Sequence, residues 1–309
     1  MSLTTLPPEI TREILLYLPI PSLLSYGLTS KANHAIQQCS LTTLRLGIFH
    51  SRLASMISLM EATASRSVLH SVQLILPKAE STNKENVMRN QNSKIARVVK
   101  LYGHCLRDLE IACWEFREPA AVAIRELRNL RRLSIRLDHP HTRYGGLQSS
   151  FWDEAEGSTV WNLLAGGKGK GGEEEALGRL RVLQLERAGV TDYQFGKILE
   201  GNKGLKEVRL RKCLGLTDKA FKILAESAVS RELETFHFTR SEVARIDDRV
   251  LVWIGKMKGL KSLSLHGCYH IDCELVKKMN EEQWHIGDLT LPSTLSSPRQ
   301  GVEVDPDYK

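Results

Sequence analysis

The sequence has no uninterrupted apolar run of about 18 residues, the length that a membrane-spanning helix needs. Its start, Met1-Ser2-Leu3, lacks the basic residues and the apolar core of a secretory signal peptide. The six cysteines are scattered over 309 residues. We therefore expect a protein of the cytoplasm, the nucleus or both, with reduced thiols and no membrane partner.

The sequence is equally poor in catalytic and cofactor motifs. Neither G-x-S-x-G nor H-E-x-x-H occurs, so no local pattern supplies a nucleophile or a metal-bound water. The glycine-rich stretch 166–172 lacks the spaced Gly-Lys-Ser/Thr of a phosphate-binding loop and favours a flexible linker. Cys268, His270 and Cys273 could bind zinc, but no second ligand pair lies at a suitable spacing. We expect no cofactor, no metal and no enzymatic activity.

The composition is that of an ordinary globular chain, with 42% apolar and 26% charged residues. A single compact core is near its size limit at 309 residues, so we expect two domains or an elongated array. The formal net charge of +7 favours acidic partners and does not by itself indicate nucleic acid.

The first forty residues carry three short helical patterns. Pro8 stands where a first helical turn tolerates proline, and apolar residues then recur at helical spacing. Pro19 and Pro21 end this helix, and two more short helices are expected after Ser22 and after Thr29 or Ser30. So few residues cannot bury so much Leu and Ile among themselves, so some of this surface needs a partner.

The rest of the chain repeats the pattern L-x-x-L-x-L, with near substitutes. The pattern starts at Leu41, Leu69, Leu106, Leu130, Leu180, Leu205, Leu233, Leu260 and Ile286. Subtracting successive starts from Leu180 onward gives steps of 25, 28, 27 and 26 residues. A Thr or Asp that can cap a helix follows each of the strands that start at Leu180, Leu205, Leu233 and Leu260. This period predicts an α/β leucine-rich repeat solenoid, with one strand and one helix per repeat and a parallel sheet on the concave wall.

Three stretches interrupt the period. The polar residues near 78–93 favour a loop or insertion. The irregular glycine-rich stretch 139–175 predicts a degenerate repeat around 151–164, with one strand missing, and then a flexible loop. The tail, 292–309, is expected to be disordered. The predicted organisation is a helical module at 1–46, a repeat array at 47–291 and this tail.

The N-terminal pattern resembles an F-box. The resemblance rests on Leu6-Pro7-x-Glu9-Ile10, Ile14-Leu15, Leu18-Pro19, Leu23-Leu24 and Ser30-Lys31, although the Trp of many members near the motif's end is missing. Cys213 and Cys268 each fall eight residues after the first Leu of their repeat, which resembles the cysteine-containing repeats common in F-box proteins. The alternative is a helical cap whose Leu and Ile merely cover the next domain.

The resemblance implies a partner and a role. F-box modules dock on the adaptor Skp1 and join a substrate receptor to a cullin-RING ubiquitin ligase, of the type called SCF, which marks proteins for proteasomal degradation. By match of motif, the Skp1-binding residues would be Leu6, Pro7, Ile10, Ile14, Leu15 and Leu18. The chain itself would be a non-catalytic substrate-recognition subunit, with an E2 enzyme supplying the chemistry. Alternatively, it would be a scaffold that works without the cullin.

The concave wall is the candidate substrate surface. Side chains alternate along a strand, so residues between the buried Leu positions point to this wall. The predicted substrate-binding residues are Arg132, Arg136, Arg209, Arg211, His237 and His266. Four arginines would suit an acidic or phosphorylated protein substrate, unless they are solvated or paired with Glu186 and Glu207. Nucleic acid is an unlikely partner, because no aromatic residues interleave with the basic stretch 125–143.

Overall fold

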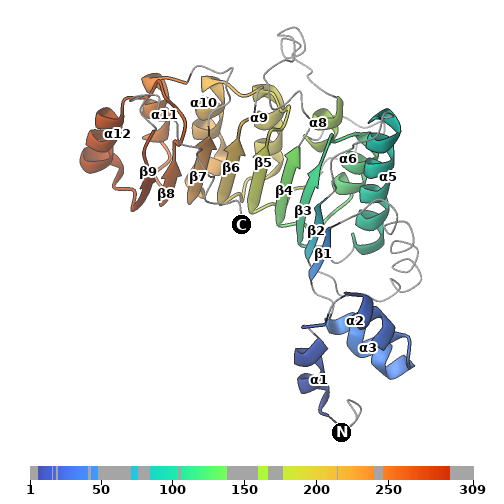
Figure 1. Ribbon diagram of the computed structural model, residues 1–309. Helices are drawn as coiled ribbons and strands as arrows, with labels where there is room; N and C mark the ends of the chain where they lie inside the picture. The colour runs from blue at the N-terminus through green and yellow to red at the C-terminus, as the bar shows by residue number, and fades with distance from the viewer. Residues whose placement is uncertain are drawn as a thin grey trace, which may run out of the picture.

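A computed structural model describes residues 6–15, 17–18, 20–40, 43–47, 71–75, 84–103, 106–137, 159–165, 177–213, 215–239 and 246–292. Within these residues the chain is an α/β protein with one parallel sheet and alternating strand-helix units. Three short helices precede this sheet in the chain (Figure 1).

The three N-terminal helices are α1 (Pro8–Leu15), α2 (Ile20–Gly27) and α3 (Lys31–Ser40). Pro8 is the first residue of α1, where its missing N–H costs nothing. Ser30 caps α3, because its Oγ accepts a hydrogen bond from the Asn33 N–H at 3.1 Å. The helix α3 packs against both α1 and α2, and the Tyr26 hydroxyl donates to Asn33 Oδ1 at 3.0 Å.

The sheet has nine parallel strands in sequence order. They are β1 (Thr43–Gly47), β2 (Ser71–Ile75), β3 (Asp108–Cys113), β4 (Arg132–Leu137), β5 (Val182–Glu186), β6 (Glu207–Arg211), β7 (Thr235–Thr239), β8 (Ser262–Ser264) and β9 (Asp288–Thr290). Each strand coincides with one of the nine repeated patterns, so their placement from sequence is confirmed. This order is compatible with a repeat solenoid.

Helices connect most of the strands and lie on one face of the sheet (Figure 1). They are α5 (Lys84–Tyr102), α6 (Glu118–Arg125), α8 (Thr159–Leu164), α9 (Asp192–Gly201), α10 (Asp218–Glu226), α11 (Leu251–Ile254) and α12 (Cys273–Met279). Short helical turns cover Ala228–Arg231, Asp248–Val250 and Asn280–Trp284. The side chains of Thr191, Thr217 and Asp272 cap α9, α10 and α12, as the sequence predicts.

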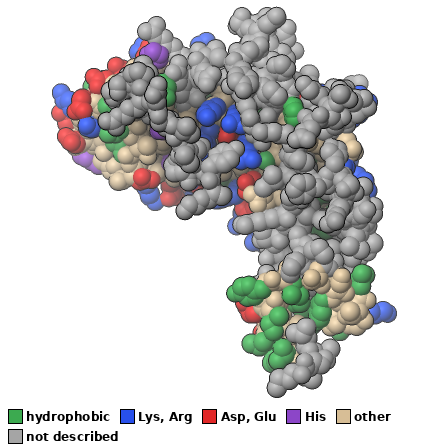
Figure 2. Space-filling view, viewed as in Figure 1, with side chains coloured by type: hydrophobic (Ala, Val, Ile, Leu, Met, Phe, Trp, Pro, Cys, Tyr) green, Lys and Arg blue, Asp and Glu red, His purple; other side chains and the backbone are tan. Residues whose placement is uncertain are grey.

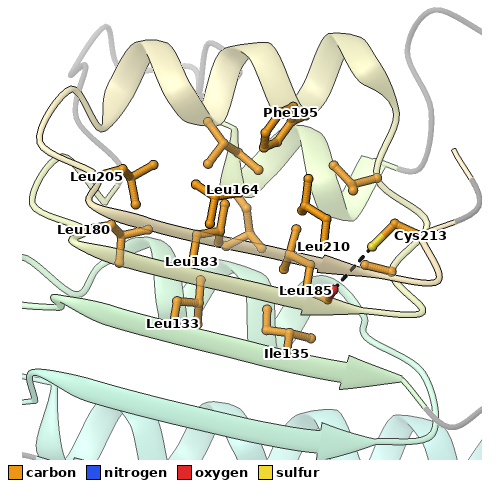
Figure 3. Packing of buried hydrophobic residues seen from close by; sticks show 14 of the residues in the cluster. Leu133, Ile135, Leu164, Leu180, Leu183, Leu185, Phe195, Leu205, Leu210 and Cys213 are labelled. Carbon is orange, nitrogen blue, oxygen red and sulfur yellow. Dashed lines mark hydrogen bonds between the residues drawn. The ribbon is translucent and has the colours of Figure 1, made fainter. Parts of the chain in front are cut away.

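The core lies between the sheet and these helices. On β5 and β6, Leu183, Leu185, Val208 and Leu210 are buried while their neighbours are half-buried, and Phe195 of α9 packs onto them (Figure 3). The buried Cys213 thiol donates to the Leu185 carbonyl at 3.4 Å. Burial raises the pKa of Cys213 to about 12, so this thiol stays protonated and serves as a core residue.

One expectation about the irregular stretches is wrong. Within the expected loop or insertion near 78–93, the polar residues from Lys84 onward form the start of α5 rather than a loop, and residues 78–83 lie outside the described residues. Asn92 is buried in this helix and both donates to the Glu115 carbonyl and accepts from the Arg117 N–H, each at 2.8 Å. These polar side chains satisfy the backbone of the segment between β3 and α6, a long-range role that a local reading cannot detect.

The gap before residue 180 agrees with the expected degenerate repeat, in which one strand is missing. The strand β4 pairs directly with β5, so no strand position is left open between them. Among its described residues, the expected degenerate repeat forms the helix α8, whose Val160, Trp161 and Leu164 are buried. The expectations for residues 139–158, 166–176 and 293–309 lie outside the described residues.

Candidate functional site

The first candidate surface is an apolar patch on the N-terminal helices. Ile10, Ile14, Tyr17 and Leu28 are 49%, 37%, 86% and 66% exposed. Ile10 and Ile14 lie four residues apart on α1 and therefore share one side of that helix. Figure 2 shows hydrophobic side chains gathered over this helical module. We call these four residues the apolar patch.

The six predicted adaptor-binding residues differ in how exposed their side chains are. Pro7, Ile10 and Ile14 are exposed, whereas Leu6 and Leu18 are half-buried. Leu15 is fully buried in the core, so in this arrangement it supports the module from inside and cannot contact a partner. Sequence reasoning missed Tyr17 and Leu28, although Tyr17 follows Ile14 by three residues and Ile10 by seven, a helical spacing that could have indicated it.

The second candidate surface is the face of the sheet opposite the helices. Burial alternates along β4, β5 and β6, and the predicted outward residues are the half-buried or exposed ones. Strand register places Arg136, Glu186 and Arg211 side by side, and Gln184, Arg209 and His237 form the neighbouring row. We call this surface the open sheet face.

Charge on the open sheet face is mixed. The charged outward residues of β3–β6 are Asp108, Glu110, Arg132, Arg136, Glu186, Glu207, Arg209 and Arg211, as many acidic as basic. Arg209 Nε lies 2.8 Å from Glu207 Oε1, which also accepts from the Gln184 amide at 2.8 Å. Arg132 Nε lies 3.9 Å from Asp108 Oδ1. Figure 2 likewise shows basic and acidic side chains next to one another near the middle of the array.

The spacing between the two arginine pairs follows from the direct pairing of β4 with β5. Arg132 and Arg136 lie on β4, and Arg209 and Arg211 lie two strands away on β6. At about 4.8 Å per strand, the two pairs are about 10 Å apart.

The two predicted histidines lie in different settings. His266 is an exposed turn residue after β8, outside the strand. His237 is on β7, with Nε2 3.0 Å from Ser262 Oγ, and the Ser262 hydroxyl donates to Asp288 Oδ2 at 2.6 Å. A Ser-His-Asp triad needs the histidine in the middle, between the hydroxyl and the carboxylate. Here the serine is in the middle, so the three residues link β7, β8 and β9 instead of activating a nucleophile.

No metal site emerges from the described part of the chain, where no group of three or more His, Cys, Asp or Glu side chains could hold an ion. Cys268 is buried, with its thiol 3.9 Å from the Phe238 carbonyl. The Cys273 thiol instead donates to the Pro292 carbonyl at 2.8 Å. The two cysteines therefore serve the packing of the last units.

A scan against protein-family models gives no match for the chain, and a search of the curated proteins gives none either. Among the described helices, none combines the length and the apolar character that crossing a membrane requires. Function must therefore be inferred from the apolar patch and the open sheet face.

Proposed function

We propose that this chain is the substrate-recognition subunit of an SCF-type ubiquitin ligase, in which the N-terminal helices dock on Skp1 and the strand-helix array binds a protein substrate. The observation that carries the proposal is the apolar patch: four large apolar side chains stay exposed on a module that contains the F-box-like pattern. Exposed apolar side chains gathered in this way are typical of a protein-protein interface.

The strand-helix array suits the second part of the proposed function, the binding of a protein substrate. Nine parallel strands in sequence order offer an extended open sheet face, and its outward side chains carry both charges. We infer a leucine-rich repeat solenoid from the recurring pattern and this strand order. In the proposed complex, the array positions a substrate protein while a neighbouring E2 enzyme transfers ubiquitin.

The test is recovery of Skp1 and a cullin with the tagged chain. Replacing Ile10 and Ile14 together by Asp should reduce Skp1 recovery by about 100-fold or more, because each buried aliphatic side chain contributes roughly 1.5–3 kcal/mol. A matched control replaces Tyr193 and Val252, two exposed apolar residues of the array, by Asp. The control variant should bind Skp1 like wild type.

The possible results separate the candidate functions. Recovery of Skp1 together with a cullin supports the ligase role. Recovery of Skp1 without any cullin would favour a scaffold that works independently of the ligase. Equal Skp1 recovery by wild type and the Ile10/Ile14 variant would show that the apolar patch is not the docking surface.

A further inference from the structure

A row of basic residues follows one edge of the sheet, where the strands begin. Backbone hydrogen bonds of 2.7–2.8 Å join Arg107 to Arg131, Arg131 to Arg181, Arg181 to Lys206, Lys206 to Glu234 and Glu234 to Lys261, each bond running from the N–H of the later residue to the carbonyl of the earlier one. These six residues therefore occupy equivalent positions on β3–β8. We call them the strand-start row.

Five of the six residues in this row are basic, and all five are exposed. At about 4.8 Å per strand, the first four span about 14 Å and the whole row about 24 Å. Further exposed basic residues stand in the turns before the strands, among them Arg128, Lys203 and Lys258. Basic charge therefore recurs in five of the six units along this row.

Much of this charge is available to a ligand. Among the described residues, neither Arg107 nor Arg131 has an ion-pair partner. Arg181 donates one hydrogen bond, to the Gly204 carbonyl at 2.9 Å, and remains exposed. Basic residues near helix ends also stabilise the helix dipole, but this effect fades within the last turn and the row lies beyond the helices.

Glu234 shows how the row holds a carboxylate. Its Oε1 lies 2.6 Å from Lys206 Nζ, and its Oε2 lies 2.7 Å from Lys261 Nζ. The hydrogen bonds from these two lysines lower the pKa of Glu234 to about 2. At this one point, the chain's own carboxylate occupies the position that an external carboxylate would take beside Arg107, Arg131 and Arg181.

The borders of the row select a narrow ligand. Exposed Glu126 and Glu200 stand at the helix ends on one side, and Asp108 and Glu207 begin the strands on the other. A double helix, whose major groove alone is about 12 Å wide, would press against these carboxylates. The described residues of the row and its turns include no aromatic side chain on which single-stranded bases could stack.

We propose that the strand-start row binds an acidic, extended polypeptide segment whose carboxylates pair with Arg107, Arg131 and Arg181. About seven extended residues cover the 24 Å row at 3.3 Å per residue. This surface is separate from the apolar patch, and the proposal does not depend on adaptor docking.

The experiment measures binding of fluorescent octaglutamate to the full chain by anisotropy at low salt. Replacing Arg107, Arg131 and Arg181 by Ala should weaken binding about tenfold, since three exposed ion pairs of roughly 0.5 kcal/mol each are lost. A control variant replaces Lys100, Lys219 and Lys278, three exposed lysines of the helices, by Ala. The control should retain nearly the wild-type affinity.

Glu234→Gln gives the more decisive result. It removes the competing carboxylate and releases Lys206 and Lys261, so octaglutamate should bind several-fold more tightly, a gain that misfolding cannot produce. Unchanged or weaker binding by Glu234→Gln, or equal losses in the arginine variant and its control, would overturn the proposal. Tighter binding of duplex DNA, or binding of a phosphoserine peptide but not of octaglutamate, would overturn the assignment to carboxylates. Normal Skp1 recovery in the same variants would separate any such failure from that of the proposed function.

Discussion

At the scale of single residues, position along a strand decides whether a side chain stabilises the fold or is available to a partner. Leu263 is fully buried on β8, and its neighbour Ser264 is half-buried on the opposite face. The alternation was predictable from sequence because the side-chain period of a strand is two. The buried Asn92 was not predictable, because its partners lie 23 and 25 residues away.

Leu263→Ala should lower the free energy of unfolding by about 2–5 kcal/mol, because it removes buried methyl groups and leaves a cavity. Ser264→Ala should change it by no more than about 0.5 kcal/mol. Chemical denaturation of both variants measures the difference. Similar losses in the two variants would mean that the strand register is shifted by one residue.

At the scale of helices and strands, the elements that carry the repeated pattern were predictable from the sequence, whereas the start of the helix in the irregular segment before β3 was not. The nine strands were located because each carries the same apolar pattern. The start of α5 has the polar composition of a loop, and its polar residues instead satisfy a distant backbone segment, which the local sequence does not indicate. Which charges on the open sheet face form pairs, such as Arg209 with Glu207, depends on the strand order as well as the local pattern.

The link between β6, β7 and β8 through Lys206, Glu234 and Lys261 should depend on pH. The pKa of Glu234 is lowered to about 2 in the folded chain from an ordinary 4.5, so its contribution to stability is present above about pH 4.5 and is lost as the pH falls towards 2. Thermal unfolding of wild type and Glu234→Gln should therefore differ near neutral pH and converge near pH 2. Salt should reduce the difference, since the lysines are exposed. A constant difference across this pH range would contradict the ion-pair assignment.

At the scale of the whole molecule, the three surfaces do not depend on one another. The apolar patch belongs to the N-terminal helices, while the open sheet face and the strand-start row belong to the array. The six-residue docking set came from a resemblance, and Leu15, unlike the exposed Ile10 and Ile14, is buried in the core. Which face of each short helix meets the rest of the chain depends on tertiary packing, which local periodicity does not specify.

The central claim, that the apolar patch docks on Skp1, is tested most directly by the mass of the purified protein in solution. Expressed alone, the chain should be poorly soluble or aggregated, because the apolar patch is uncovered. Co-expressed with Skp1, it should be soluble and give a one-to-one complex by light scattering after size exclusion. Replacing Ile10 and Ile14 of the apolar patch together by Asp should abolish this complex while circular dichroism of the array is unchanged. Equal solubility with and without Skp1, or a one-to-one complex that survives the Ile10/Ile14 change, would contradict the claim.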